Sequence, residues 1–211
     1  MSERFSKALI LATEAHTGQV RKGATNTAGV ALPYITHPVG VAALTQRYGG
    51  DEDQVIAALL HDVLEDAGAH WAARIEAEFG PRVLAMVEAC TDGTPDASGQ
   101  KAPWEERKRA YLAHLAEAKP EALLVSACDK LYNLQAILLD LTETGPQVFE
   151  RFTASREGTL WYYGELVRAF VGKVPAPLLA AMERDLGAIH ARLAPGADES
   201  IQTECAGSSR N

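Results

Sequence analysis

Apolar residues recur at intervals of three and four positions along most of the chain, a spacing that predicts amphipathic α-helices. The first such stretch covers residues 6–20, where Ala8, Leu11 and Ala15 fall on one face. No segment shows a convincing strand-like alternation of apolar and polar positions, so the pattern predicts an all-α fold, a compact multi-helix bundle. Further helices are expected over residues 36–48, 51–67, 70–78, 81–90, 104–118, 120–141, 146–171 and 176–193.

Segments rich in turn-forming residues separate the predicted helices. Residues 21–36 and 92–103 are expected to be loops, because both combine glycine and proline with polar residues. Two prolines at positions 175 and 177 precede the last helix, and the small polar residues after position 194 predict disorder. We therefore expect a helical domain over residues 1–173, a C-terminal helix over 174–194 and a disordered tail over 195–211.

The amino-acid composition indicates the class of protein and the cellular compartment in which it is expected. Hydrophobic residues make up 47% of the chain, which is typical of a globular protein. The three cysteines form no C-x-x-C pair and are odd in number, which argues against a disulfide framework and for a reducing compartment. The N-terminal residues lack the apolar core of a signal peptide, and no apolar run approaches the length of a membrane span. We expect a cytoplasmic protein with no membrane partner.

The balance of acidic and basic residues bears on whether the protein binds nucleic acid or a small anionic substrate. Twenty basic and 28 acidic residues give a net charge of −8. Such an excess of negative charge argues against a broad nucleic-acid-binding surface. It is compatible with a small anionic substrate, because a metal ion or a local basic patch reverses the field within one cleft.

The segment A-L-L-H-D-V-L-E-D, residues 58–66, places four ionisable groups in six positions of an apolar helix. His61 and Asp62 are about 100° apart around a helix axis, so both can lean toward one point. Glu65 and Asp66 each follow four residues later, one turn along the face of their partner. An exposed acidic face would explain this pattern, but the apolar flanks make these groups costly to desolvate unless a cation or a partner compensates.

Two further residues carry candidate chemistry. His37 stands at a helix start in P-Y-I-T-H-P, where a lone histidine also fits a surface or capping role. Asp129 lies in the middle of a strongly apolar helix, and Asn133 shares its face four residues on. A buried carboxylate needs a partner, which a structural hydrogen bond or salt bridge could also supply.

Together, the three segments form a combination that is more specific than any one of them. They supply two imidazoles and two carboxylates, a mixed nitrogen and oxygen set that suits Mn²⁺ or Fe²⁺, and Zn²⁺ less exclusively. Four protein ligands leave open positions on an octahedral ion for water and a phosphate oxygen, whose reaction the ion would promote. The expected metal ligands are His37, His61, Asp62 and Asp129.

This H…HD…D pattern resembles the signature of the HD superfamily of metal-dependent phosphohydrolases. The chain is more closely similar to the hydrolase domain of the RelA/SpoT alarmone enzymes, and above all to the stand-alone small alarmone hydrolases, the Mesh1-like proteins. The similar segments occur in the same order as in the family and extend over about residues 5–170. It is carried by A-H-T-G-Q-V-R-K (15–22), P-Y-I-T-H-P-V-G-V-A (33–42), A-A-L-L-H-D-V-L-E-D (57–66), F-G-P-R-V (79–83), E-R-K-R (106–109) and D-K-L-Y-N-L (129–134).

The resemblance implies an activity and a role for each matching residue. Family members hydrolyse guanosine 3′-diphosphate 5′-di- or triphosphate and release pyrophosphate from the 3′ position, with Mn²⁺ as cofactor. The four expected ligands fall on the metal-ligand positions, and Glu65 and Asp66 on the acidic pair that orients or activates the attacking water. Asn133 falls on a position that contacts the nucleotide, and Arg21 and Lys22 match a basic pair near the substrate.

Other features refine this expectation. Lys130 is a further candidate for binding phosphate, and the basic cluster 107–109 is a weaker one, since a charge run on a helix is usually solvated. The segment 23–32 is longer than the short turn common in the family, which leaves the choice between guanosine and adenosine alarmones open. The alternatives are an HD phosphohydrolase of another nucleotide or phosphodiester, and a non-catalytic alarmone-binding or antitoxin module.

Overall fold

The structure, a computed structural model, describes residues 2–92, 100 and 102–194. The expected tail over 195–211 and most of the loop over 93–101 lie outside these residues. Helices dominate the described part of the chain, in agreement with the predicted all-α class. The elements are α1 (Glu3–Ala15), β1 (Val20–Thr25), β2 (Ala31–Pro33), α2 (Thr36–Arg47), α3 (Glu52–Leu60), α4 (Val63–Asp66), η1 (Ala69–Trp71), α5 (Ala72–Phe79), α6 (Pro81–Cys90), α7 (Trp104–Glu117), α8 (Pro120–Thr144), η2 (Pro146–Arg151), α9 (Arg156–Phe170) and α10 (Ala176–Leu193).

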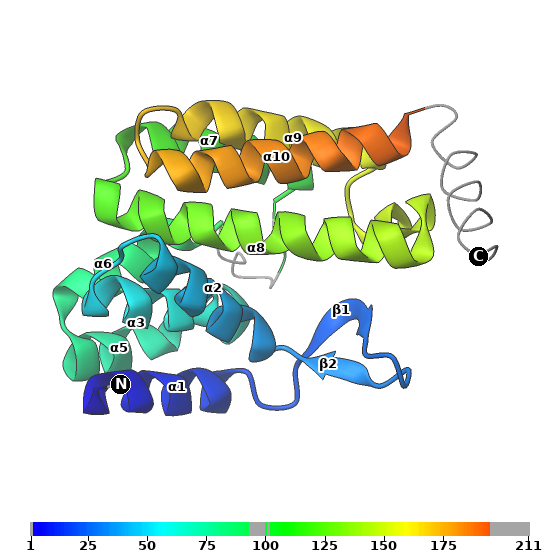
Figure 1. Cartoon of the computed structure of the whole chain (residues 1–211). Coiled ribbons are helices and arrows are strands. Elements are labelled where there is room, and N and C mark those ends of the chain that lie inside the picture. Colours follow the sequence, from blue (N-terminus) through cyan, green and yellow to red (C-terminus); the bar gives the residue numbers. More distant parts are fainter. Residues whose placement is uncertain (1, 93–99, 101, 195–211) are drawn as a thin grey trace, which may run out of the picture.

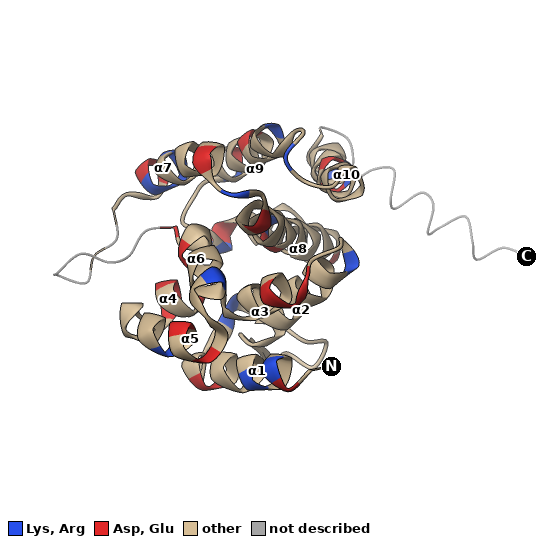
Figure 2. Ribbon diagram, turned by 90° about the vertical axis from the view of Figure 1, so that its left-hand side faces the viewer, with Lys and Arg blue, Asp and Glu red and all other residues tan. Residues whose placement is uncertain are grey.

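The long helix α8 is the centre of the molecule. It lies between one group of helices that contains α2, α3 and α6 and another that contains α9 and α10 (Figures 1 and 2). Its buried side chains include Leu123, Val125, Leu131 and Leu134, and burying each such side chain contributes about 1.5–3 kcal/mol. The C-terminal helix α10 packs along α8, so it covers part of this core.

The core helix α8 has the length and the apolar composition of a membrane span. This helix has 25 residues, and a window of 18 reaches a mean hydropathy of 1.3. The expectation that no apolar run approaches the length of a membrane span is therefore wrong. Within the structure, 61% of that window is buried against other helices, which accounts for its apolar composition.

Helix starts follow the local chemistry in most places. Asp51 caps α3, with its side chain accepting from Gln54 N–H and the Gln54 side chain accepting in return from Asp51 N–H. Pro81 occupies the first turn of α6, where its missing N–H costs nothing. The start of α2 has no side-chain cap: Thr36 is its first residue, and the Thr36 hydroxyl donates to the Pro33 carbonyl.

Two expected helices are interrupted. The helix predicted over 51–67 ends as α3 at Leu60 and resumes as α4 at Val63, so His61 and Asp62 occupy the junction. The stretch 146–171 forms the short η2 and then α9, which starts after the Ser155 cap. Residues on either side of each break are buried. The apolar spacing in the sequence therefore continues through both breaks.

Residues 20–33 form an antiparallel β-hairpin, so the prediction of a loop without strands is wrong there. Strand β1 pairs with β2, with Val20 opposite Pro33 and Thr25 opposite Ala31. The Asn26 side chain closes the turn by accepting from the backbone N–H groups of Ala28 and Val30. The hairpin projects beyond α1 and α2 and lies beside α8 (Figure 1). Because its side chains are mostly exposed, its sequence lacks a strand-like alternation.

Candidate metal centre and active site

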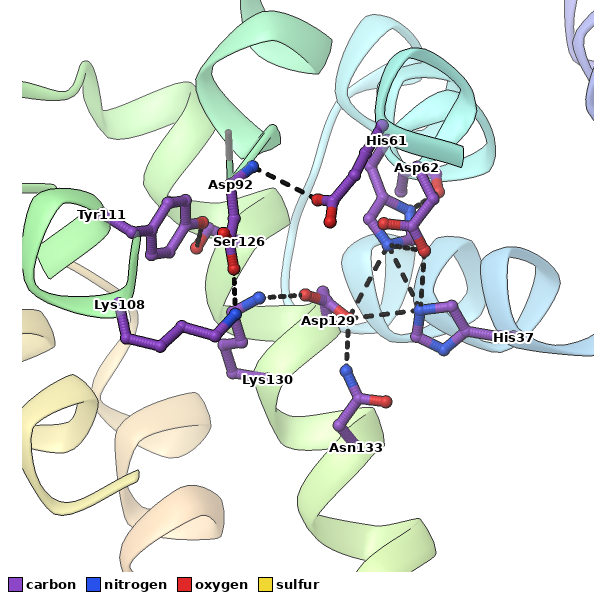
Figure 3. A network of polar contacts seen from close by, with 12 residues as sticks. His37, His61, Asp62, Asp92, Lys108, Tyr111, Ser126, Asp129, Lys130 and Asn133 are labelled. Atoms are coloured by element: carbon purple, nitrogen blue, oxygen red, sulfur yellow. Dashed lines mark hydrogen bonds and ion pairs between the residues drawn. The ribbon is translucent and has the colours of Figure 1, made fainter. Parts of the chain in front are cut away.

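Four residues from three separate segments meet in the interior (Figure 3). His37 lies in the first turn of α2, His61 and Asp62 lie at the junction of α3 and α4, and Asp129 lies at the middle of α8. The His37 Nε2 atom is 3.2 Å from His61 Nε2, 3.3 Å from Asp62 Oδ2 and 3.2 Å from Asp129 Oδ1. The His61 Nε2 atom is 3.0 Å from Asp62 Oδ2 and 3.6 Å from Asp129 Oδ1.

The approach of α2 to α8 brings His37 and Asp129 together. A Cβ atom at Gly40 would overlap the Tyr132 ring, so the glycine lets this side chain of α8 pack closely against α2. Tyr132 also packs its ring near the His37 imidazole, with centroids 5.3 Å apart. Helix packing therefore sets the position of His37 before any ligand binds.

The two imidazoles point the same nitrogen at one common space. The His61 Nδ1 atom donates to the Ala58 carbonyl at 2.8 Å, so Nε2 is the nitrogen that faces the cluster. The His37 Nε2 atom lies 3.2 Å from this nitrogen. Two ligand atoms that bind one metal ion at right angles, each with a metal–ligand bond of about 2.1 Å, would lie about 3 Å apart, similar to the two imidazole nitrogens here. A cation between the rings would satisfy both nitrogens.

The electrostatics of the cluster also favour a cation. Burial lowers the pKa of the His61 imidazole, but the Asp62 and Asp129 carboxylates outweigh burial and raise it well above its ordinary value. Burial raises the pKa of the Asp129 carboxyl, but Lys130 and the two imidazoles outweigh burial and hold it well below its ordinary value. The carboxylates are therefore ionised inside the protein, where a positive charge stabilises them.

The donor set fits a divalent metal ion. Ligand atoms of His37, His61 and Asp129 all lie within 4.8 Å of one another, and all three residues are buried. Asp62 Oδ2 adds a second carboxylate oxygen close to both imidazoles, and it also accepts a hydrogen bond of 2.7 Å from the Tyr34 hydroxyl. Two imidazoles and two carboxylates suit first-row divalent metals better than Ca²⁺ or Mg²⁺.

The two predicted acids lie on α4, directly after the cluster. Glu65 is half-buried, and its Oε2 accepts from the Asp92 backbone N–H at 3.2 Å. Asp66 is more exposed; desolvation, followed by the charge of Asp62, raises the pKa of its carboxyl. A carboxyl with a raised pKa is better suited to exchange a proton near neutral pH.

A cavity of about 600 Å³ lies along α8 beside the cluster. It is lined by all four residues that were expected to bind substrate, namely Arg21, Lys22, Lys130 and Asn133. Asn133 donates to Asp129 Oδ1 at 2.7 Å and accepts from Arg21 at 3.2 Å, so it links the cavity to the cluster. Lys130 donates to the other oxygen of Asp129 at 2.6 Å.

The three residues of the basic cluster 107–109 lie in different environments. Lys108 lines the cavity and forms an ion pair with the buried Asp92 carboxylate. Arg107 donates to the other Asp92 oxygen at 2.6 Å, and Arg109 pairs with Glu105 on the surface. Only Lys108 of this cluster therefore faces the cavity.

Two residues of the site were not assigned a role from the sequence. Tyr34 stands three residues before His37 in the P-Y-I-T-H-P motif, and its hydroxyl holds Asp62. Asp92 begins a segment expected to be a polar loop, but its side chain is only 5% exposed and holds Arg107 and Lys108. Its charge could have been connected to the basic cluster only by knowing that α6 and α7 bring both ends of the loop together.

Known proteins share this arrangement of helices and motifs. A family model described as an HD domain matches residues 8–160, more than half of the chain. The chain belongs to the HD-domain family. The resemblance to that superfamily and the expected helical HD fold are thus confirmed.

Relatives of this HD-domain chain include enzymes of the Mesh1 group. The guanosine-3′,5′-bis(diphosphate) 3′-pyrophosphohydrolase MESH1 of Xenopus tropicalis is 40% identical over 126 residues, which cover 59% of this chain and 64% of that protein. The human MESH1 of the same name is 37% identical over 138 residues, which cover 64% of this chain and 68% of that protein. The expected similarity to Mesh1-like proteins is therefore confirmed.

A solved structure agrees with this HD-domain assignment. It is that of a metazoan ortholog of SpoT that hydrolyses ppGpp and plays a role in starvation responses. It matches the fold with a TM-score of 0.69 at 28% identity, covering 88% of this chain and 94% of that one.

Proposed function

We propose that this HD-domain protein is a manganese-dependent pyrophosphohydrolase that removes the 3′-diphosphate of guanosine 3′,5′-bis(diphosphate). The observation that carries the proposal is the buried cluster of two imidazoles and two carboxylates beside a cavity lined by cationic side chains. The names of the MESH1 relatives and of the SpoT ortholog support the choice of substrate. In the net reaction, water and the tetraphosphate give guanosine 5′-diphosphate and pyrophosphate.

His37, His61, Asp62 and Asp129 would hold the metal. Mn²⁺ is our choice because it accepts mixed imidazole and carboxylate ligands in octahedral geometry. When bound, the ion supplies Lewis-acid activation of the phosphoryl group and of the attacking water. Tyr34 and Asn133 orient the two carboxylates by donating hydrogen bonds to Asp62 and Asp129.

Glu65 and Asp66 would act on the attacking water. Glu65 lies one helical turn after the ligand junction, and the Asp92 backbone N–H holds one of its oxygens. Its carboxylate can accept a proton as the water oxygen attacks the phosphorus bonded to the 3′ oxygen. Asp66 is placed to take up or return a proton from the solvent side, because it is the more exposed of the two.

The cationic side chains of the cavity would bind the phosphates. Arg21 and Lys22 approach from β1, and Lys108 and Lys130 approach from α7 and α8. Lys108 and Lys130 are held by Asp92 and Asp129, so their ammonium groups are positioned before substrate binds. Preorganised cations stabilise the charge that develops during phosphoryl transfer.

Product identification tests this function. Metal-depleted protein is incubated with guanosine 3′,5′-bis(diphosphate), with and without added Mn²⁺, and the products are separated by anion exchange. The proposal predicts equal amounts of pyrophosphate and guanosine 5′-diphosphate, formed only with the metal. Orthophosphate as the product, or turnover of only other nucleotides, would point to another HD phosphohydrolase activity. Tight binding of the nucleotide without turnover, in protein shown to contain the metal, would point to a non-catalytic module.

A further inference from the structure

The cavity also contains a polar pair, Asp140 and Arg151, which lies far along α8 from the metal cluster. Asp129, Asn133 and Asp140 are spaced four and seven residues apart, which places them on one side of the helix. Eleven residues of helix separate Asp140 from Asp129 by about 16 Å. Asn133 and Asp140 both line the cavity, so this side of α8 forms a continuous wall.

Asp140 is paired with Arg151 of η2 inside the cavity. The Arg151 Nη1 atom donates to Asp140 Oδ2 at 2.8 Å, and both side chains are about one quarter exposed, at 27% and 29%. The hairpin fixes the course of the arginine, because a Cβ atom at Gly23 would lie 2.6 Å from Arg151 Cδ. Three segments, β1, α8 and η2, therefore meet at this pair.

The charge of this pair distinguishes it from the phosphate-binding end of the cavity. Asp140 cancels the charge of Arg151, so the pair has no net attraction for a polyphosphate. It offers hydrogen-bond acceptors on the carboxylate beside hydrogen-bond donors on the guanidinium. Such an alternation suits an uncharged ligand edge that carries both donors and acceptors, as a nucleobase does.

Apolar side chains beside the pair offer a surface for a flat ring. Leu139 and Phe152 line the cavity next to Asp140 and Arg151, and they are 57% and 39% exposed. Exposed large apolar side chains at the mouth of a cavity are typical of ligand sites. Aromatic and apolar side chains stack on nucleobases whatever their hydrogen-bonding edge.

We propose that Asp140 and Arg151 read the base of the substrate and select guanine over adenine. Because the inference concerns the nucleobase of an alarmone, it rests on the proposed function. The carboxylate accepts from the N1–H and the exocyclic N–H of guanine, and the guanidinium donates to O6. Adenine would place the lone pair of its N1 atom against the Asp140 carboxylate, which leaves both groups unsatisfied.

The substitution Asp140→Asn tests this assignment. kcat/KM is measured for guanosine and adenosine 3′,5′-bis(diphosphates) in the parent and the variant. The parent is expected to favour guanosine by about tenfold or more, the discrimination that one bidentate pair supplies. In the variant this ratio falls about tenfold, while the adenosine value holds or rises, because an amide can also donate to adenine. Glu165→Gln removes a surface ion pair with Arg168 outside the cavity and is the matched control.

A binding measurement separates this inference from the proposed function. Calorimetric titration with guanosine and adenosine 5′-diphosphates reads the base preference without any turnover. Loss of the guanine preference in Asp140→Asn, with the control unchanged, supports the pair as the reader of the base even if no pyrophosphate is released. An equal preference for guanine in the variant and the parent, or no preference in the parent, overturns the inference.

Discussion

The two ends of the cavity along α8 are built from different kinds of structure. At the metal end, His37, His61 and Asp129 are buried on or next to core helices, and each has several polar neighbours. At the outer end, Asp140 is ion-paired with Arg151 of η2, which packs against the exposed hairpin. Core helices therefore position the groups of the metal cluster, whereas at the outer end a peripheral segment supplies Arg151, one half of the pair proposed to read the base.

Substitutions at the metal end should have the largest effect on turnover. Asp129→Ala removes a proposed metal ligand and the ion-pair partner of Lys130. Since changes in residues behind metal ligands already cost about 10–100-fold, losing a ligand should lower kcat/KM by more than about a hundredfold. Metal content by elemental analysis and pyrophosphate release are measured together.

Stability is checked in the same variant, because breaking a buried ion pair costs about 3–5 kcal/mol of unfolding free energy. Asp129→Asn breaks the same ion pair but preserves the volume of the side chain, so it separates the loss of charge from the loss of packing. Equal metal occupancy and activity in the Asp129→Ala variant and the parent would contradict the assignment of this residue.

Glu65→Gln should separate chemistry from metal binding. The amide can still accept from the Asp92 N–H, but it cannot take a proton from water. We expect kcat to fall by about 10²–10⁴-fold, the usual contribution of a general base, with unchanged Mn²⁺ affinity. Single-turnover rates and metal titration measure the two effects, and a variant that turns over at the parental rate would exclude the proposed role.

Asp92→Asn should have an intermediate effect. The Asp92 carboxylate holds Lys108 at the cavity wall and Arg107 behind it. Removing its charge leaves Lys108 less well positioned, so kcat/KM should fall about tenfold while metal content is unchanged. Glu105→Gln breaks the surface pair with Arg109 of the same helix and is the matched control. A parallel loss in both variants would indicate a general effect on α7 instead.

Gly23→Ala should have the smallest effect and should act only at the outer end. The new methyl group would displace Arg151, and the positive φ of 69° adds about 1–2 kcal/mol of strain. The preference for guanine should fall a few-fold, with kcat changed less than twofold. Gly29→Ala introduces similar strain in the same hairpin at a φ of 76°, but no atom lies within 4 Å of its Cβ. If the two variants behave alike, Arg151 is not the group affected.

The same contrast explains what could be predicted from the sequence. Ionisable residues such as His61 and Asp129 stand out because they interrupt apolar helix patterns, and burial demands a compensating partner. The hairpin around Gly23 carries no such signal, since its exposed strands lack alternation. The role of Tyr34 and the pairing of Asp92 depend on contacts across the fold, which local spacing does not encode.

Anomalous scattering from a crystal grown with Mn²⁺ tests the proposed metal cluster most directly. One strong peak is expected within bonding distance of Nε2 of His37 and His61 and of a carboxylate oxygen of Asp62 and Asp129. A protein that shows manganese-dependent turnover but has its anomalous peak elsewhere, with these four side chains paired only to one another, would contradict this assignment.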